Sequence, residues 1–168
     1  SSLFSIDSTA AGAISILGNN NGETSTWTTS ANPLPLARNA GATTTANGYI
    51  YMVGGDAGAG GTTSVYYAKL NADGTVGSWT ANANLLPLGR RDHSVVSYNG
   101  YIYALGGSPD GTTAQTTAYY AKLNTDGSTG TWAATTPITA ARMQHSSVAY
   151  NGYIYVVGGT TTGPNTWY

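Results

Sequence analysis

Short runs in which apolar and polar residues alternate are the clearest pattern along the chain. In the segment HSVVSYNG, which begins at His93, the two kinds of position alternate and the run ends in Asn-Gly. The segment YIYALGG follows at once from Tyr101. Because strand side chains point alternately to opposite faces of a sheet, and Asn-Gly favours a two-residue type I′ turn, this pattern predicts a β-hairpin.

Two further strands are predicted after this hairpin. TAYYAKLN, from Thr117, has the Tyr-rich composition of a strand and leads into a turn at 125–127. A fourth strand holding Trp132 comes next. Each unit is therefore expected to be an antiparallel meander of four strands.

The same block occurs three times. NGYIYMVGG, NGYIYALGG and NGYIYVVGG begin at residues 47, 99 and 151, which are 52 residues apart. A period of this length is close to that of one four-stranded propeller blade. The landmarks that keep the period to within one residue are one tryptophan, one arginine and a glycine pair per unit: Trp27, Trp79, Trp132; Arg38, Arg90, Arg142; Gly54 and Gly55, Gly106 and Gly107, Gly158 and Gly159.

The order of these landmarks resembles the kelch motif: Arg, His-Ser, an Asn-Gly turn, aromatic-Ile-Tyr, Gly-Gly, Tyr-Tyr and a spaced Trp. The resemblance covers roughly residues 13–168 and implies an all-β propeller fold of kelch-like, four-stranded antiparallel blades, three per chain. A single domain, 1–168, is expected, with repeat units at about 27–78, 79–131 and 132–168. The first repeat departs from the motif, since Gly41 stands where the others carry histidine.

Three blades do not close a propeller, because closed rings need roughly 4–8. Residues 13–29 align at an offset of 52 with the third and fourth strands of the next unit, so 13–26 are expected to complete the last blade. We expect two chains to exchange these strands and form a six-bladed homodimer. The alternative is a longer natural chain whose other blades complete the ring. The near-identity of the repeats also fits a recent duplication or an engineered protein. Residues 1–12 fit no repeat position, although LFSID alternates like a strand and is expected to add to an edge.

Composition narrows the classes of partner. Only 8% of residues are charged and the net charge is −1, so a nucleic-acid partner is not expected. The absence of cysteine excludes disulfides, thiol catalysis and zinc sites built on cysteine. No apolar run approaches the roughly 18 residues of a membrane span, so no membrane partner is expected. The localisation is left open; a Thr-, Asn- and Gly-rich surface of low charge favours an extracellular bacterial protein.

The candidate binding residues lie just before the first strand of each unit. The kelch resemblance places one arginine per blade on the loop face near the central channel, where a ring of guanidinium groups would bind carboxylates bidentately. Histidines accompany two of the arginines. The candidates are Arg38, Arg90, Arg142, His93 and His145. The alternative is that each side chain packs between blades, with the arginines bonded to carbonyl groups.

No catalytic residue, metal or cofactor is predicted. The acidic residues are scattered, and neither histidine has an acidic partner at a fixed spacing. The expected function is therefore a non-catalytic binding module that presents loop-face arginine and aromatic residues to a glycan or an acidic protein segment. The alternative is a structural, self-assembling propeller fragment without a ligand. Both stay open, because a fold does not supply a function by itself.

Overall fold

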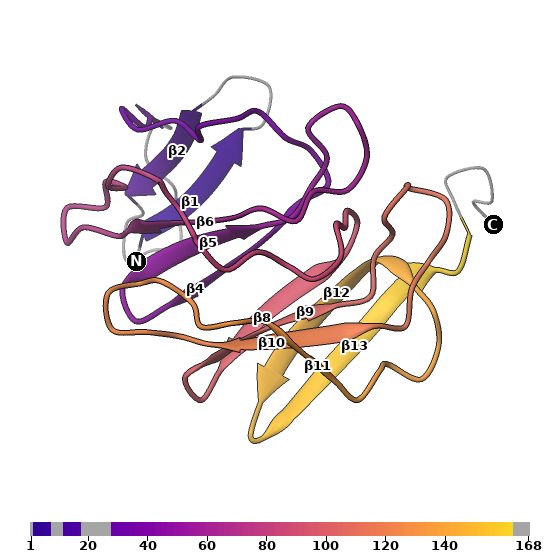
Figure 1. The fold of residues 1–168 in the computed structure, drawn as a ribbon. Helices are drawn as coiled ribbons and strands as arrows, with labels where there is room; N and C mark the ends of the chain where they lie inside the picture. The colour runs from indigo at the N-terminus through magenta and orange to yellow at the C-terminus, as the bar shows by residue number, and fades with distance from the viewer. Residues whose placement is uncertain (1, 8–11, 18–27, 163–168) are drawn as a thin grey trace.

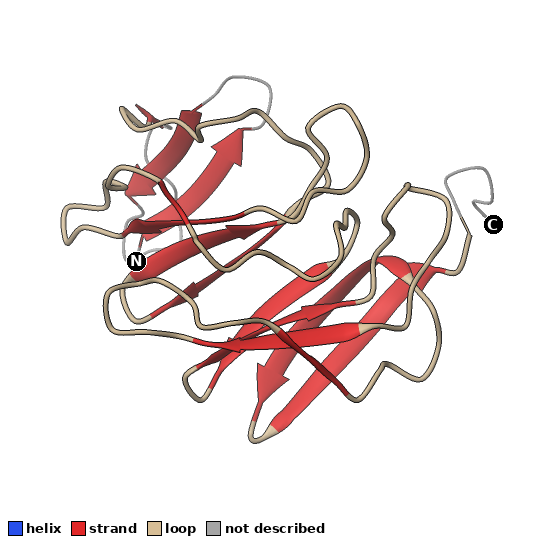
Figure 2. Cartoon of the chain, in the orientation of Figure 1, coloured by secondary structure: helices blue, strands red, loops and turns tan. Residues whose placement is uncertain are grey.

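Antiparallel strands make up the architecture of the chain (Figures 1 and 2). The computed structural model describes residues 2–7, 12–17 and 28–162, and within these ranges it contains no helix. Consequently no described segment is a helix long and apolar enough to span a membrane. The all-β fold class predicted from the sequence is confirmed.

The described strands form two four-stranded sheets, one three-stranded sheet and one hairpin. The first sheet has the order β4-β5-β6-β7 (Ala42–Ala46, Tyr49–Val53, Val65–Lys69, Thr80–Ala81). The second sheet joins β8, β9, β10 and β11 (Ser94–Tyr98, Tyr101–Leu105, Ala118–Lys122, Ala133–Thr135). The last hairpin is β12 and β13 (Met143–Tyr150, Tyr153–Thr160). The N-terminal sheet has the order β1-β2-β3 (Ser2–Asp7, Gly12–Leu17, Thr28–Thr29).

The Asn-Gly pairs form the predicted tight turns. Asn99 and Gly100 have φ angles of 49° and 79°, and the equivalent pairs at 47–48 and 151–152 have the same left-handed backbone. Two consecutive positive φ angles define the type I′ turn, whose twist matches that of the flanking strands. The three predicted hairpins are therefore confirmed, and the predicted four-stranded meander is present in the first and second sheets.

The N-terminal sheet has the register of a third and a fourth strand. β2 pairs with β3 through Ile14 and Thr29, each of which lies 52 residues before the pair Tyr66 and Ala81 of the first sheet. The other edge of β2 is paired with β1, so LFSID does add to an edge as expected. Completion of the last unit by residues 13–26 stays a prediction, and residues 18–26 lie outside the described ranges.

The core lies where one sheet faces the next. Tyr51 and Val53 of the first sheet are fully buried against Ile102 and Ala104 of the second. A smaller cluster joins the second sheet to Ile154 and neighbouring residues of the last hairpin. In Figure 1 the first sheet, the second sheet and the last hairpin follow one another in chain order, with their Asn-Gly turns at one end and their Gly-Gly segments at the other.

The outer face of the last hairpin is exposed. Its apolar side chains keep 47–71% of their accessible surface, and they are Val148, Tyr150, Tyr153, Tyr155 and Val157. The residues of the first sheet that stand at the same repeat positions as Tyr155 and Val157 are Tyr51 and Val53, both with 0% exposure. The same motif is thus core in one repeat and surface in another.

Candidate functional site

The Arg90 side chain is buried at the second sheet, and its hydrogen bonds connect the segment before β8 to the end of β9 and the start of β10. Its side chain donates hydrogen bonds to the Gly106 carbonyl (2.8 Å) and to the carbonyl and hydroxyl of Thr117 (3.3 and 3.1 Å). The guanidinium carbon lies 4.6 Å from the centre of the Tyr119 ring, a cation–π distance. With 1% exposure, this side chain points into the sheet.

Arg38 repeats the arrangement in the first sheet. It donates to the Gly54 carbonyl at 2.7 Å and to the Ser64 hydroxyl at 2.8 Å, and lies 4.8 Å from the centre of the Tyr66 ring. Burial lowers the pKa of Arg90 to about 10, against an opposing contribution from Tyr119, and burial likewise lowers the pKa of Arg38. Both side chains therefore remain cationic at neutral pH.

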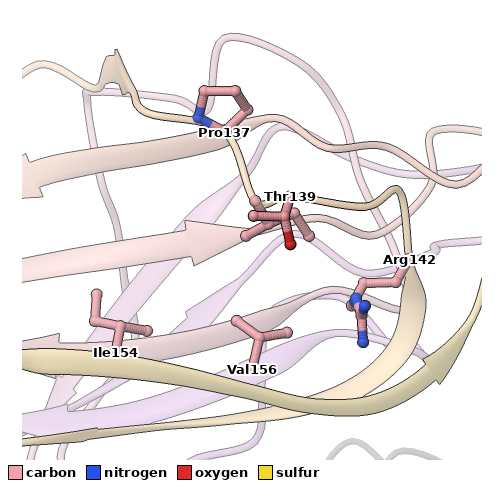
Figure 3. A pocket seen from close by; sticks show the side chains of 6 residues that line it. Pro137, Thr139, Arg142, Ile154 and Val156 are labelled. Carbon is pink, nitrogen blue, oxygen red and sulfur yellow. The ribbon is translucent and has the colours of Figure 1, made fainter.

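Arg142 occupies the same position in the last hairpin but has different surroundings. It donates to the Gly158 carbonyl at 2.8 Å. Beside it lies a hollow of about 280 Å³, whose other lining residues are Pro137, Ile138, Thr139, Ile154 and Val156 (Figure 3). In the second sheet, the tyrosine of the third strand covers the equivalent arginine. Among the described residues, no aromatic ring is placed over Arg142 in the same way, and the hollow lies beside it instead.

The arginine backbone also connects successive repeats. Gly55 donates its N–H to the Arg90 carbonyl at 2.8 Å, and Gly107 donates to the Arg142 carbonyl at 2.9 Å. The Arg90 and Arg142 carbonyls thus each accept a bond from the preceding repeat, while the side chain of each arginine donates to a glycine of its own repeat. The predicted landmarks form one hydrogen-bonded chain from the first sheet to the last hairpin.

The two histidines pack against the first glycine of the preceding repeat. A Cβ placed on Gly54 would lie 2.6 Å from the Arg90 carbonyl oxygen and 2.8 Å from Cε1 of His93. Gly106 stands in the same relation to Arg142 and His145. These approaches, together with positive φ angles of 58° and 57°, restrict both positions to glycine.

Burial, with smaller contributions from Arg90 and His145, lowers the pKa of His93 to about 3. The pKa of His145 is also lowered, first by burial and then by Arg142. Both rings are therefore neutral near pH 7. In the first repeat, where Gly41 replaces histidine, the side chain of Met52 fills the space.

Three residues at equivalent positions form a ladder that the sequence did not reveal. Ala40, Asp92 and Gln144 all have left-handed backbone, with φ of 50°, 55° and 58°. Asp92 donates its N–H to the Ala40 carbonyl at 2.8 Å, and Gln144 donates to the Asp92 carbonyl at 2.7 Å. We call these three residues the rim. Their side chains have different chemical properties. The one sequence feature that could have identified them is their position, because each lies two residues after the repeated arginine.

Charged side chains surround the middle of the rim. Arg91 pairs with Asp56 at 2.5 Å and with Asp92 at 3.1 Å. Hydrogen bonds from the N–H groups of Gly58 and Gly60, with help from Arg91, hold the pKa of Asp56 below its usual value. Backbone N–H groups of the 112–113 turn similarly lower the pKa of Asp110. Within the described part of the chain, no three His, Cys, Asp or Glu side chains gather as metal ligands would.

The predicted aromatic landmarks have packing roles where they are described. Trp132 is 5% exposed and belongs to the core between the two four-stranded sheets. Trp79 packs beside Ile50, Ala68 and Val76 on the opposite face of the first sheet. Trp27 lies outside the described residues.

Comparison with known proteins identifies a likeness of fold. No family model matches the chain, and no curated protein matches its sequence. Among solved structures, one titled "Structure of YjhT" is similar, with a TM-score of 0.61 and 23% identity. The similarity covers 76% of this chain and 36% of that one, so the chain spans little more than a third of that structure. At this identity the likeness concerns the fold alone.

Proposed function

We propose that the chain is a non-catalytic β-propeller module of the kelch type that binds a glycan at its rim. The rim ladder is the observation that carries this proposal. Through it, each repeat contributes one residue to a continuous main-chain ladder, and the middle residue, Asp92, pairs with Arg91. Recurrent loop ends on a rigid scaffold are the usual place for binding residues.

The charges near the rim favour a glycan over an acidic protein segment. Arg38 and Arg90, the predicted carboxylate ligands, are buried and bonded to their own sheets. Arg91, which lies beside the rim residue Asp92, is already paired with two carboxylates. Asp56 and Asp92 would repel an acidic segment, whereas sugar hydroxyls donate to carboxylates and accept from guanidinium and amide groups.

A glycan-binding screen followed by calorimetry tests the proposal. Asp92→Asn keeps a residue that tolerates left-handed backbone but removes the charge, and we expect it to weaken glycan binding at least tenfold. The matched control is Asp73→Asn, in a turn between β6 and β7 at the opposite end of the sheet. Tight binding of an acidic peptide, or no glycan binding at millimolar concentration, would contradict the proposal.

A second candidate, a self-assembling propeller unit, is favoured by the exposed face of the last hairpin. Five apolar side chains lie there, and the equivalent face of the first sheet is covered by the second sheet. Exposed contiguous apolar surface of this kind is typical of a protein interface. Light scattering coupled to size-exclusion chromatography tests it directly, since assembly requires a mass above the 17.2 kDa of one chain.

A further inference from the structure

Within the described residues, no third strand lies beside β13 of the last hairpin, whereas each of the two four-stranded sheets has one at that place. In the second sheet, β9 pairs on one side with β8 and on the other with β10. Among the described strands, β13 pairs with β12 alone. Its other edge therefore presents backbone N–H and C=O groups that can accept a further strand.

The register of the N-terminal sheet identifies a segment that fits this edge. β2 and β3 already pair as a third and a fourth strand, with Ile14 at the position of Tyr66. In the first sheet Tyr66 is paired with Met52, and the residue at the equivalent position of β13 is Val156. Docking in the repeat register therefore sets Ile14 opposite Val156, beside the hollow at Arg142.

The edge of β2 that would have to dock is occupied by β1. Ser5 pairs with Ile14 in the N-terminal sheet, so Ser5 stands where Val156 would stand. One edge cannot pair with two strands at once. β1 and β13 are thus alternative partners for β2.

The open space around Gly158 also indicates that a second copy of the chain packs against the last hairpin. A Cβ on Gly54 or Gly106 would meet the arginine carbonyl of the next repeat, but around Gly158 it would meet nothing within 4 Å. The repeat that follows β3 in the chain is the first sheet, which begins after Arg38. A chain that docks β2 and β3 on β13 therefore also brings its first sheet toward Gly158 and the exposed hairpin face.

From these observations we propose that β2 and β3 of a second copy pair with β13 and complete the last sheet. Within one chain, β1 covers the edge of β2, and we propose that it is displaced when two copies exchange strands. The inference rests on the self-assembly function proposed above and names its partner and its competing strand. When the exchange is reciprocal, two copies close into a ring of six four-stranded sheets. Tyr155 and Val157 are then covered as Tyr51 and Val53 are.

Paired cysteines in the full chain test the exchange, because the natural sequence contains none. Ile14→Cys with Val156→Cys places the two thiols opposite one another only after exchange, at a separation a disulfide can bridge. We expect mild oxidation to give a covalent dimer with two intermolecular bridges. The matched control combines Ile14→Cys with Val157→Cys, which lies on the opposite face of β13, and should cross-link at least tenfold less.

Two further variants test the role of β1. Ser5→Cys with Ile14→Cys should form a bridge within one chain, hold β1 on β2 and leave a monomer. Removal of residues 1–7 should raise the dimer fraction at a given concentration at least tenfold. If removal leaves the chain monomeric up to high micromolar concentration, the exchange is refuted.

The possible failures are distinguishable. A dimer by mass that cross-links no better through Val156 than through Val157 would refute the exchange and leave self-assembly standing. Assemblies larger than two copies would refute the closed pair. A monomeric mass for every variant would refute both the exchange and self-assembly, while the glycan proposal is judged separately by the binding of the unaltered chain.

Discussion

The second sheet and the last hairpin have nearly the same sequence but different surroundings. Arg90 is bonded to Gly106 just after β9 and to Thr117 just before β10, lies against Tyr119 and is 1% exposed. Arg142, at the same position of the repeat, donates to the Gly158 carbonyl and borders a hollow. The difference arises from the third strand and from the repeat that follows. A residue of the motif thus takes its role from the sheet beside it.

The largest predicted difference concerns these two arginines. Arg90→Ala should lower the free energy of unfolding by roughly 3–5 kcal/mol, because it leaves buried carbonyl groups without a donor and opens a cavity. Arg142→Ala should cost less than about 1 kcal/mol, since its bond is partly exposed. Urea unfolding followed by tryptophan fluorescence, at a concentration where the chain is monomeric, measures both. Equal losses would show that the two environments do not differ in energy.

A smaller difference in the free energy of unfolding is expected between alanine substitutions of Gly106 and Gly158. Gly106→Ala should cost roughly 2–4 kcal/mol, because the new methyl group meets the Arg142 carbonyl at 2.7 Å in addition to the left-handed backbone penalty. Gly158→Ala has open space and should carry only the backbone penalty, about 1–2 kcal/mol. The same unfolding experiment applies. A larger cost at Gly158 in dimeric samples would sharpen the comparison, because a second copy would then press on this position.

A more gradual effect, spread over several pH units, is the pH dependence of stability due to His93. Its pKa of about 3 in the folded chain lies below the value of about 6.5 in the unfolded chain. Between these values the unfolded state binds more protons, so stability is full above pH 6.5 and falls as the pH is lowered. His93→Gln should flatten this fall by about 1 kcal/mol per pH unit between pH 6 and 4. Parallel stability curves for the two proteins would contradict the burial of a neutral ring.

Local features of the fold were predictable because local chemistry determines them. Asn-Gly pairs at 47, 99 and 151 specify tight turns, and alternation specifies the strands. The 52-residue offset also located β2 and β3 as a third and a fourth strand before their pairing was seen. That LFSID would form a strand was likewise readable from its pattern. Which edge it would join was not, because alternation carries no information about a neighbour.

The sequence identified the repeated arginine as a candidate residue, but it did not determine the orientation of its side chain. The sequence selected Arg90, yet left open whether its side chain would face solvent or carbonyl groups. That choice depends on Gly106 and Thr117, which are 16 and 27 residues away and meet the arginine only in the folded sheet. The rim escaped detection because alanine, aspartate and glutamine share no side-chain signature, and only their backbone angles are common.

The main-chain bonding of the rim determines which amino-acid substitutions these three positions tolerate. Its contacts between repeats are made by main-chain atoms, Asp92 to Ala40 and Gln144 to Asp92. Any side chain that tolerates a left-handed backbone can therefore be exchanged there without loss of the connection between repeats. In the proposed binding module, recognition would depend on the side chains of these residues and architecture on their main chain, so a library varied at these three positions would test new ligands on an unaltered frame.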